Sequence, residues 1–205
     1  MLDLRTIRLM NEGDRGLIVI TDDAERMRQD DIWRLIRGEM NLKSPITYRY
    51  HLGSKPLDLI ETTFPARHLL SRRFVQALTA GGFTGWSTYP IRVLGKDGRE
   101  IVGYHGFSIT GKCGPVDWSR SERVDRAFRG STKTYLRGVY FDETTWDGSD
   151  VFLVEGSARI CVVQSVYEVL KPLFLTNVDF LPLSQEMVPM SVIPPHRLGG
   201  NMGAD

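Results

Sequence analysis

Short apolar runs of strand length recur along the chain, and turn-forming residues separate them. Runs of about four to eight such residues between glycine, asparagine, aspartate or proline are typical of β-strands. Three pairs of runs flank polar turns, and each pair predicts a hairpin. The pairs are residues 6–10 with 17–20, 91–94 with 100–104, and 139–141 with 151–154. The second pair has the strongest signal, because Asp97-Gly98 lies in its turn.

Helical spacing appears at three places. Apolar positions within residues 32–40 recur every three to four residues, which predicts a short amphipathic helix. The clearest signal begins at Ser71, a typical N-cap residue, and ends at Gly81-Gly82, where a left-handed cap costs little. A third helix is predicted over residues 164–170, since Pro172 ends it, and a strand follows over residues 174–181.

Two of these blocks match at a constant offset of 92 residues. Each block runs from a helix through a turn into a strand that a proline ends. The matching pairs are Leu78 with Leu170, Phe83 with Leu175, Thr84 with Thr176, and Pro90 with Pro182. Any helix followed by a proline-ended strand would match about as well, so a duplication and a chance likeness both stay open.

Together these elements predict an α+β fold with a mixed, largely antiparallel sheet or sheets, a few short helices, and room for two pseudo-repeated helix–strand units. The 205 residues fit one large domain, which we expect over residues 1–186. From Met187 onward prolines and a glycine pair interrupt any periodicity. We therefore expect residues 187–205 to form an extended or mobile tail.

Composition narrows the functional classes. Hydrophobic residues make up 41% of the chain and charged residues 25%, which suffices for a core and excludes a largely disordered protein. With a net charge of +1, the chain has no strong overall electrostatic field that would attract nucleic acid or an anionic membrane. The N-terminal residues mix charged and apolar types, and no apolar run approaches the roughly 20 residues that cross a bilayer. We expect a cytoplasmic protein with no export signal and no membrane partner.

Cysteines and histidines give no sign of a metal or cofactor. Cys113 and Cys161 lie far apart and match neither a disulfide framework nor a zinc spacing. Reduced thiols are expected, with a single bridge between the two kept as an alternative. The four histidines never occur at the spacing of a helical metal pair.

The segment from Tyr104 to Cys113 brings together a histidine, a serine and a cysteine. It lacks the serine motif of a nucleophile elbow, and it lacks a phosphate loop because Cys113 follows Lys112 where a hydroxyl residue is required. A nucleophile pair of His105 with Cys113 is conceivable. An enzyme of unrecognised class that uses this segment is therefore one alternative, although an ordinary strand leaving through a glycine-rich turn is favoured.

Basic residues recur at every third position in one stretch. They are Arg120, Arg123, Arg126 and Arg129, with Lys133 beyond them. Such a series could follow phosphates, which makes a nucleic-acid adaptor that uses Arg120 to Lys133 a second alternative. Glu122 and Asp125 interleave with the series and nearly neutralise it, so we favour a salt-bridged exposed face.

A polar loop carries four acidic residues and a tryptophan, without the residue order of a calcium loop. It could present a negative surface to a basic partner, because an aromatic residue beside charges suits an interface anchor. Two further tryptophans are candidates, with core packing as the alternative. The candidate partner-binding residues are Asp142, Glu143, Trp146, Asp147, Asp150, Trp86 and Trp118.

Four short segments, in a set order and spacing, carry a family resemblance. They are residues 55–59 (KPLDL), 70–74 (LSRRF), 82–90 (GFTGWSTYP) and 116–122 (VDWSRSE), and the Phe180-Leu181-Pro182 block follows them. In this order the chain resembles a family of bacterial immunity proteins from polymorphic toxin systems, the eleventh in its series. The match covers about two-thirds of the chain and includes no catalytic signature.

The resemblance implies a cytoplasmic α+β protein that neutralises a toxin encoded nearby by direct binding. The family defines no catalytic residues to carry over. An inhibitor of this kind needs a rigid scaffold and a complementary surface, and needs neither cofactor nor metal. We therefore expect a non-catalytic protein-binding module whose partner is a cognate toxin, with nucleic acid a less favoured partner.

Overall fold

The computed structural model describes residues 3–9, 16–21, 27–62, 68–157 and 159–194. These residues form three short α-helices and three sheets, which confirms the predicted α+β class with mixed, largely antiparallel sheets. The helices are α1 (Gln29–Ile36), α2 (Arg72–Ala80) and α3 (Gln164–Leu170). None of the described helices is both long enough and apolar enough to cross a membrane.

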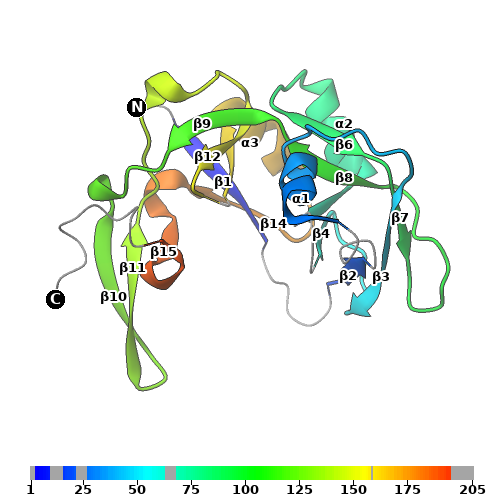
Figure 1. Cartoon of the computed structure of the whole chain (residues 1–205), viewed down its shortest axis with the longest axis horizontal. Coiled ribbons are helices and arrows are strands. Elements are labelled where there is room, and N and C mark those ends of the chain that lie inside the picture. The colour runs from blue at the N-terminus through cyan, green and yellow to red at the C-terminus, as the bar shows by residue number, and fades with distance from the viewer. Residues whose placement is uncertain (1–2, 10–15, 22–26, 63–67, 158, 195–205) are drawn as a thin grey trace.

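The strands form sheets of seven, five and three (Figure 1). The seven-stranded sheet has the spatial order β6 (Trp86–Tyr89), β8 (Tyr104–Ile109), β5 (His68–Ser71), β4 (Leu59–Thr62), β2 (Ile18–Thr21), β3 (Ile46–Leu52) and β7 (Ile91–Leu94). The five-stranded sheet has the order β14 (Val178–Pro182), β1 (Leu4–Leu9), β13 (Ile160–Val163), β12 (Val151–Glu155) and β9 (Gly111–Pro115). The smallest sheet consists of β10 (Glu122–Phe128), β11 (Ser131–Arg137) and β15 (Met187–Pro189).

Helix α2 forms where the sequence predicts it, for the predicted reasons. The Ser71 hydroxyl accepts a hydrogen bond from the Phe74 amide at 3.3 Å and so caps the first turn. Phe74 and Leu78 are fully buried on one face. The helix ends at Gly81, and Gly82 adopts the left-handed conformation that glycine tolerates. Helix α3 likewise matches its prediction, and it packs against α2.

The chain contains an internal structural repeat. The first half runs from β1 to β6 and the second from β8 to β14. In the first half β5 leads directly into α2 and then β6, and in the second β13 leads directly into α3 and then β14. The order β6-β8-β5-β4-β2 matches the order β14-β1-β13-β12-β9, including one parallel pair in each, β2 with β4 and β9 with β12. The residue register also matches: Leu70 pairs with Leu59 and His105, and Val162 pairs with Val151 and Arg5.

Two reciprocal hydrogen-bonded contacts join the halves and obey the same offset of 92 residues. The Asp58 carboxylate accepts from the Thr176 amide at 2.8 Å and from its hydroxyl at 2.9 Å. The Asp150 carboxylate accepts from the Thr84 amide and hydroxyl, both at 2.8 Å. We call these the Asp–Thr contacts. They show that the offset of 92 residues found in the sequence is also a repeat of the structure.

The two halves also exchange their first strands. Strand β1, from the start of the chain, lies between β13 and β14 of the second half. Strand β8, which begins the second half, lies between β5 and β6 of the first. Neither half completes its sheet without a strand from the other, so we expect the two to unfold together.

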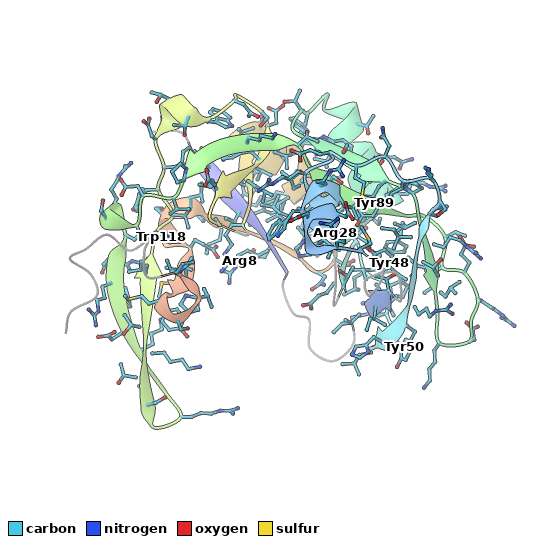
Figure 2. All side chains as sticks on the ribbon, viewed as in Figure 1. Arg8, Arg28, Tyr48, Tyr50, Tyr89 and Trp118 are labelled. Atoms are coloured by element: carbon cyan, nitrogen blue, oxygen red, sulfur yellow. The ribbon has the colours of Figure 1, made fainter. Side chains whose placement is uncertain are left out.

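Three apolar clusters fill the interior. The central cluster lies around α2 and α3 and draws residues from both halves, such as Phe74 and Val166. One lateral cluster contains Trp118 and the other contains Tyr48 and Tyr89, whose hydroxyl oxygens lie 3.3 Å apart. Figure 2 shows these two lateral clusters on opposite sides of the molecule.

Two predicted hairpins are wrong. Strands β1 and β2 belong to different sheets, so residues 6–9 do not pair with residues 17–20, and Met10 lies outside the described residues. Residues 139–141 form no strand, and β12 pairs with β9 and β13 instead. The Asp97-Gly98 turn is present, with hydrogen bonds between residues 93–95 and 99–101, but β8 then leaves to pair with β5 and β6.

The predicted tail begins too early. Met187–Pro189 form strand β15, which pairs with β11, and the 3-10 helix Met190–Val192 follows. Val188 and Ile193 are buried in the Trp118 cluster. Periodicity does not reveal this segment, because prolines interrupt it and its three-residue strand is too short to show alternation. Residues 195–205 of the predicted tail lie outside the described residues.

Candidate functional site

One long connection distinguishes the two otherwise similar halves. Between β9 and β12, residues 116–150 contain the 3-10 helices η3 (Trp118–Arg120) and η4 (Glu143–Thr145) and the hairpin of β10 and β11. The equivalent connection between β2 and β4 contains α1 and β3 instead. Because the framework repeats and this segment does not, a specialised surface is expected on residues 116–150.

Two adjoining open hollows lie on the surface of this segment. The larger has a volume of about 580 Å³ and is lined by residues that include Val116, Asp117, Arg120, Phe141, Asp142 and Glu143. The smaller, about 250 Å³, shares Arg120, Phe141 and Glu143 and extends to Asp3. We call the two together the acidic hollow, because four carboxylates surround it and Arg120 is the one basic residue in its described lining.

Short capping motifs hold two of these carboxylates in place. Asp117 Oδ1 accepts from the Ser119 amide at 3.1 Å and from its hydroxyl, and so caps η3. Asp142 Oδ1 accepts from the Thr144 amide at 2.9 Å and from its hydroxyl at 2.7 Å, and so caps η4. The hydrogen bonds from Thr144 lower the pKa of Asp142 from its ordinary value of 3.8. In the described structure the Oδ2 atom of each carboxylate has no hydrogen-bond partner.

Backbone and aromatic contacts join the two capped turns. The Asp117 amide donates to the Tyr140 carbonyl oxygen at 2.8 Å. The Arg120 guanidinium lies over the Tyr140 ring, with Cζ 4.7 Å from the ring centroid. Phe141 is buried under the hollow, and Trp118 lies in the same core cluster. The hollow therefore has a rigid apolar base and a charged rim.

Glu143 and Arg120 are the two exposed charges that both hollows share. Across the part of the chain that the structure describes, no hydrogen bond or ion pair engages either side chain. A partner can therefore bind these groups without breaking an internal hydrogen bond or ion pair.

The other predicted acidic residues are engaged internally. Asp147 accepts from the Ser149 amide and hydroxyl and from the Lys112 amide at 2.8 Å. Burial opposes its ionisation, but these hydrogen bonds outweigh it and lower the pKa of Asp147. Asp150 forms the Asp–Thr contact with Thr84. The structure thus gives Asp147 and Asp150 roles in local architecture.

The three predicted tryptophans differ in exposure. Trp118 is 3% exposed and presents almost no surface to a partner (Figure 2). Trp146 is half-buried, donates to the Ser149 carbonyl oxygen at 3.1 Å and packs on Phe152. Trp86 is half-buried and donates to the Phe83 carbonyl oxygen at 2.8 Å. None of the three lines the hollow as described.

The sequence prediction missed Asp117, Arg120 and Phe141 as neighbours of Asp142 and Glu143. One signal was available. An aspartate followed two residues later by serine or threonine occurs at Asp117, Asp142 and Asp147, and this pattern is typical of side chains that cap a turn. It indicates that these carboxylates are fixed rather than mobile.

No catalytic pair forms between His105 and Cys113. His105 lies in β8 of the seven-stranded sheet, whereas Cys113 lies in β9 of the five-stranded sheet. The Cys113 sulfur is 3.6 Å from the Thr145 hydroxyl. Burial raises the pKa of the Cys113 thiol, which disfavours the nucleophilic thiolate. Both cysteines are free thiols. In the described ranges no three potential metal ligands cluster.

A second charged cluster lies beside β1. The Glu186 carboxylate is 1% exposed, accepts from the Thr6 hydroxyl at 3.0 Å and pairs with Arg159 at 2.7 Å. Arg8, which is labelled in Figure 2, is 44% exposed and lies 4.0 Å from this carboxylate. Both carboxylate oxygens are engaged, so this cluster fastens the chain around residue 186 to β1 and leaves no open acceptor for a ligand.

No protein-family model matches the chain, and no curated protein is significantly similar to it.

Proposed function

We propose that this protein is a non-catalytic binding module that neutralises a bacterial toxin by direct contact, and that the acidic hollow receives a basic side chain of that toxin. The single observation that carries the proposal is the hollow itself. An unpaired Glu143 stands beside Asp117 and Asp142, each with a free Oδ2 in the described structure, above the buried Phe141 ring.

The geometry suits a lysine or arginine. Asp117 and Asp142 are already held by their capping hydrogen bonds, so little conformational entropy is lost when they bind. A guanidinium needs several acceptors in fixed positions, and three neighbouring carboxylates supply them. Arg120 lies over the Tyr140 ring, which keeps its charge at the rim.

The sequence resemblance supports a toxin as the partner. One of the segments that carry it, residues 116–122, forms a wall of the hollow. Immunity proteins of that family act by binding and need no reactive centre. The localisation that goes with this function, the cytoplasm, is part of the same proposal.

The test is co-expression with the product of the adjoining gene. We expect the two proteins to purify together and host growth to be restored. Replacing Glu143 by lysine should weaken the complex at least about tenfold, because it sets two cations against each other in the hollow. The matched control is Glu168→Lys, the same charge change at an exposed position on α3.

Calorimetry or interferometry on the purified pair gives the affinity. Raising the salt concentration should weaken the wild-type complex, since the contact is electrostatic. If Glu143→Lys and Glu168→Lys bind equally well, the hollow is not the contact site. If no complex forms and growth is not restored, the proposed function itself is wrong.

A further inference from the structure

Strand β10 is a long free edge. It spans seven residues, Glu122–Phe128, and in the described structure it pairs with β11 alone. The β10–β11 ribbon, residues 122–137, projects away from the main body in Figure 1. Free edges of this length invite another strand, and proteins ordinarily shorten or cover them.

The turn of the ribbon fixes which backbone groups point outward. Arg129 and Gly130 have φ values of 45° and 80°, as in the two-residue type I′ turn between paired residues. Phe128 and Ser131 therefore form a hydrogen-bonded pair, and pairing alternates along the ladder from there. It follows that the amides and carbonyls of Arg123, Asp125 and Ala127 point away from β11.

Charge on the ribbon is strongly basic. Residues 122–137 contain five basic and two acidic side chains. Both acids are engaged with β11, Glu122 in an ion pair with Arg137 and Asp125 in a hydrogen bond from the Thr134 hydroxyl at 2.6 Å. Arg123 and Arg126 have no carboxylate within ion-pair distance among the described residues.

We propose that the β10 edge binds an extended, acidic segment of a protein partner as an added strand. Outward donors and acceptors alternate along the edge with the repeat of a β-strand, and the arginines attract glutamate or aspartate on the incoming strand. This surface is separate from the acidic hollow and goes beyond the function proposed above.

Two other occupants fit less well. A second copy carries the same excess of basic side chains, five against two acidic, and both of its acids are already engaged with β11, so two such ribbons repel each other. Nucleic acid would use the arginines and the amides, but phosphates only accept hydrogen bonds, so the outward carbonyl groups would gain nothing.

The probe is a fluorescein-labelled peptide of alternating glutamate and valine, titrated with the full chain by fluorescence anisotropy. We expect saturable binding that weakens with salt and is absent for a lysine–valine peptide. Ala127→Pro removes an outward amide but no bond to β11, because proline is tolerated on the free side of an edge strand. It should weaken binding at least about tenfold.

The matched control is Thr132→Pro, directly across the ribbon from Ala127 on β11. Its amide points to the opposite side, where β15 pairs only with residues 135–137. We expect this variant to bind the peptide within about twofold of wild type. The double variant Arg123→Glu with Arg126→Glu tests charge without proline, and it should abolish binding.

Three results would overturn the proposal. The first is no saturable binding of the acidic peptide below about 1 mM. The second is equal loss in both proline variants. The third is tighter binding of a labelled DNA duplex that Ala127→Pro leaves unchanged, which would identify a nucleic-acid surface. Glu143→Lys should not affect the peptide, so a failure here is distinguishable from a failure of the acidic hollow.

Discussion

Replacing Asp58 by asparagine tests how strongly one Asp–Thr contact holds the two halves together. Asp58 Oδ2 accepts from the Thr176 amide and hydroxyl and from Arg73 at 2.6 Å, and Oδ1 accepts from the Ser71 hydroxyl at 2.6 Å. Asparagine keeps the shape but has only one accepting oxygen. In the variant, the amide nitrogen must therefore face either the donors of Thr176 and Arg73 or the hydroxyl of Ser71.

The expected cost follows from these contacts. Hydrogen bonds to a charged group contribute about 1.5–3 kcal/mol each, and leaving a buried donor unpaired adds to the loss. Arg73 is 52% exposed, so solvent screening limits its ion pair to about 1 kcal/mol or less. We therefore expect Asp58→Asn to lower the free energy of unfolding by about 3 kcal/mol.

The repeat supplies an internal reference, Asp150→Asn. Asp150 contacts Thr84 in the same way, but it is half-buried and no arginine pairs with it among the described residues. Its replacement should cost only about 1 kcal/mol. Urea denaturation at neutral pH, followed by tryptophan fluorescence, measures both values.

Acid should remove the difference between wild type and Asp58→Asn. Burial opposes ionisation of Asp58, but hydrogen bonds from Arg73, Ser71 and Thr176 outweigh it and lower its pKa below the ordinary 3.8. The stabilisation by Asp58 is therefore complete above pH 3.8 and is lost as the pH falls through the pKa of Asp58 in the folded protein. This reasoning is refuted if both asparagine variants lose the same free energy of unfolding. It is also refuted if the difference between wild type and Asp58→Asn stays constant as the pH falls.

Two further predictions concern the ribbon turn and the thiols. Arg129→Asn should raise the free energy of unfolding by about 0.5 kcal/mol, because asparagine before Gly130 suits the type I′ turn; a lower value in urea denaturation would exclude that turn. Burial raises the pKa of Cys161 far above its ordinary value and raises that of Cys113 less. Ellman's reagent at pH 8 should therefore leave both thiols unmodified in native protein and modify both in urea, whereas fast reaction of the native protein would mean that the thiols are accessible.

Elements defined by neighbouring residues could be predicted from the sequence. Helix α2 depends on Ser71, on two buried apolar positions and on Gly82, all within one short segment. The first hairpin could not be predicted, because β1 pairs with residues 160–163 and 178–182. A local pattern shows that a segment is extended, but it does not show which distant strand completes the ladder.

The candidate site could likewise be predicted only where neighbouring residues define it. Acidic character near Asp142 and Glu143 was visible in the sequence, and both residues line the hollow. Arg120 was assigned to a charged series, yet it lies on Tyr140 while the other members of that series lie in or beside the ribbon. The two turns converge through the backbone hydrogen bond from Asp117 to Tyr140 and the contact of Arg120 with the Tyr140 ring, which no composition or spacing reveals.

The exchange of β1 and β8 has a consequence for how the protein is made. Strand β1 is synthesised long before its neighbours in the sheet, since its residue Ile7 pairs with Ile160. At about 5–20 residues per second, this strand waits roughly 8 to 30 s for its neighbours. Nascent chains stalled before residue 160 should therefore be protease-sensitive in residues 4–9, and full protection should come only after synthesis of β14.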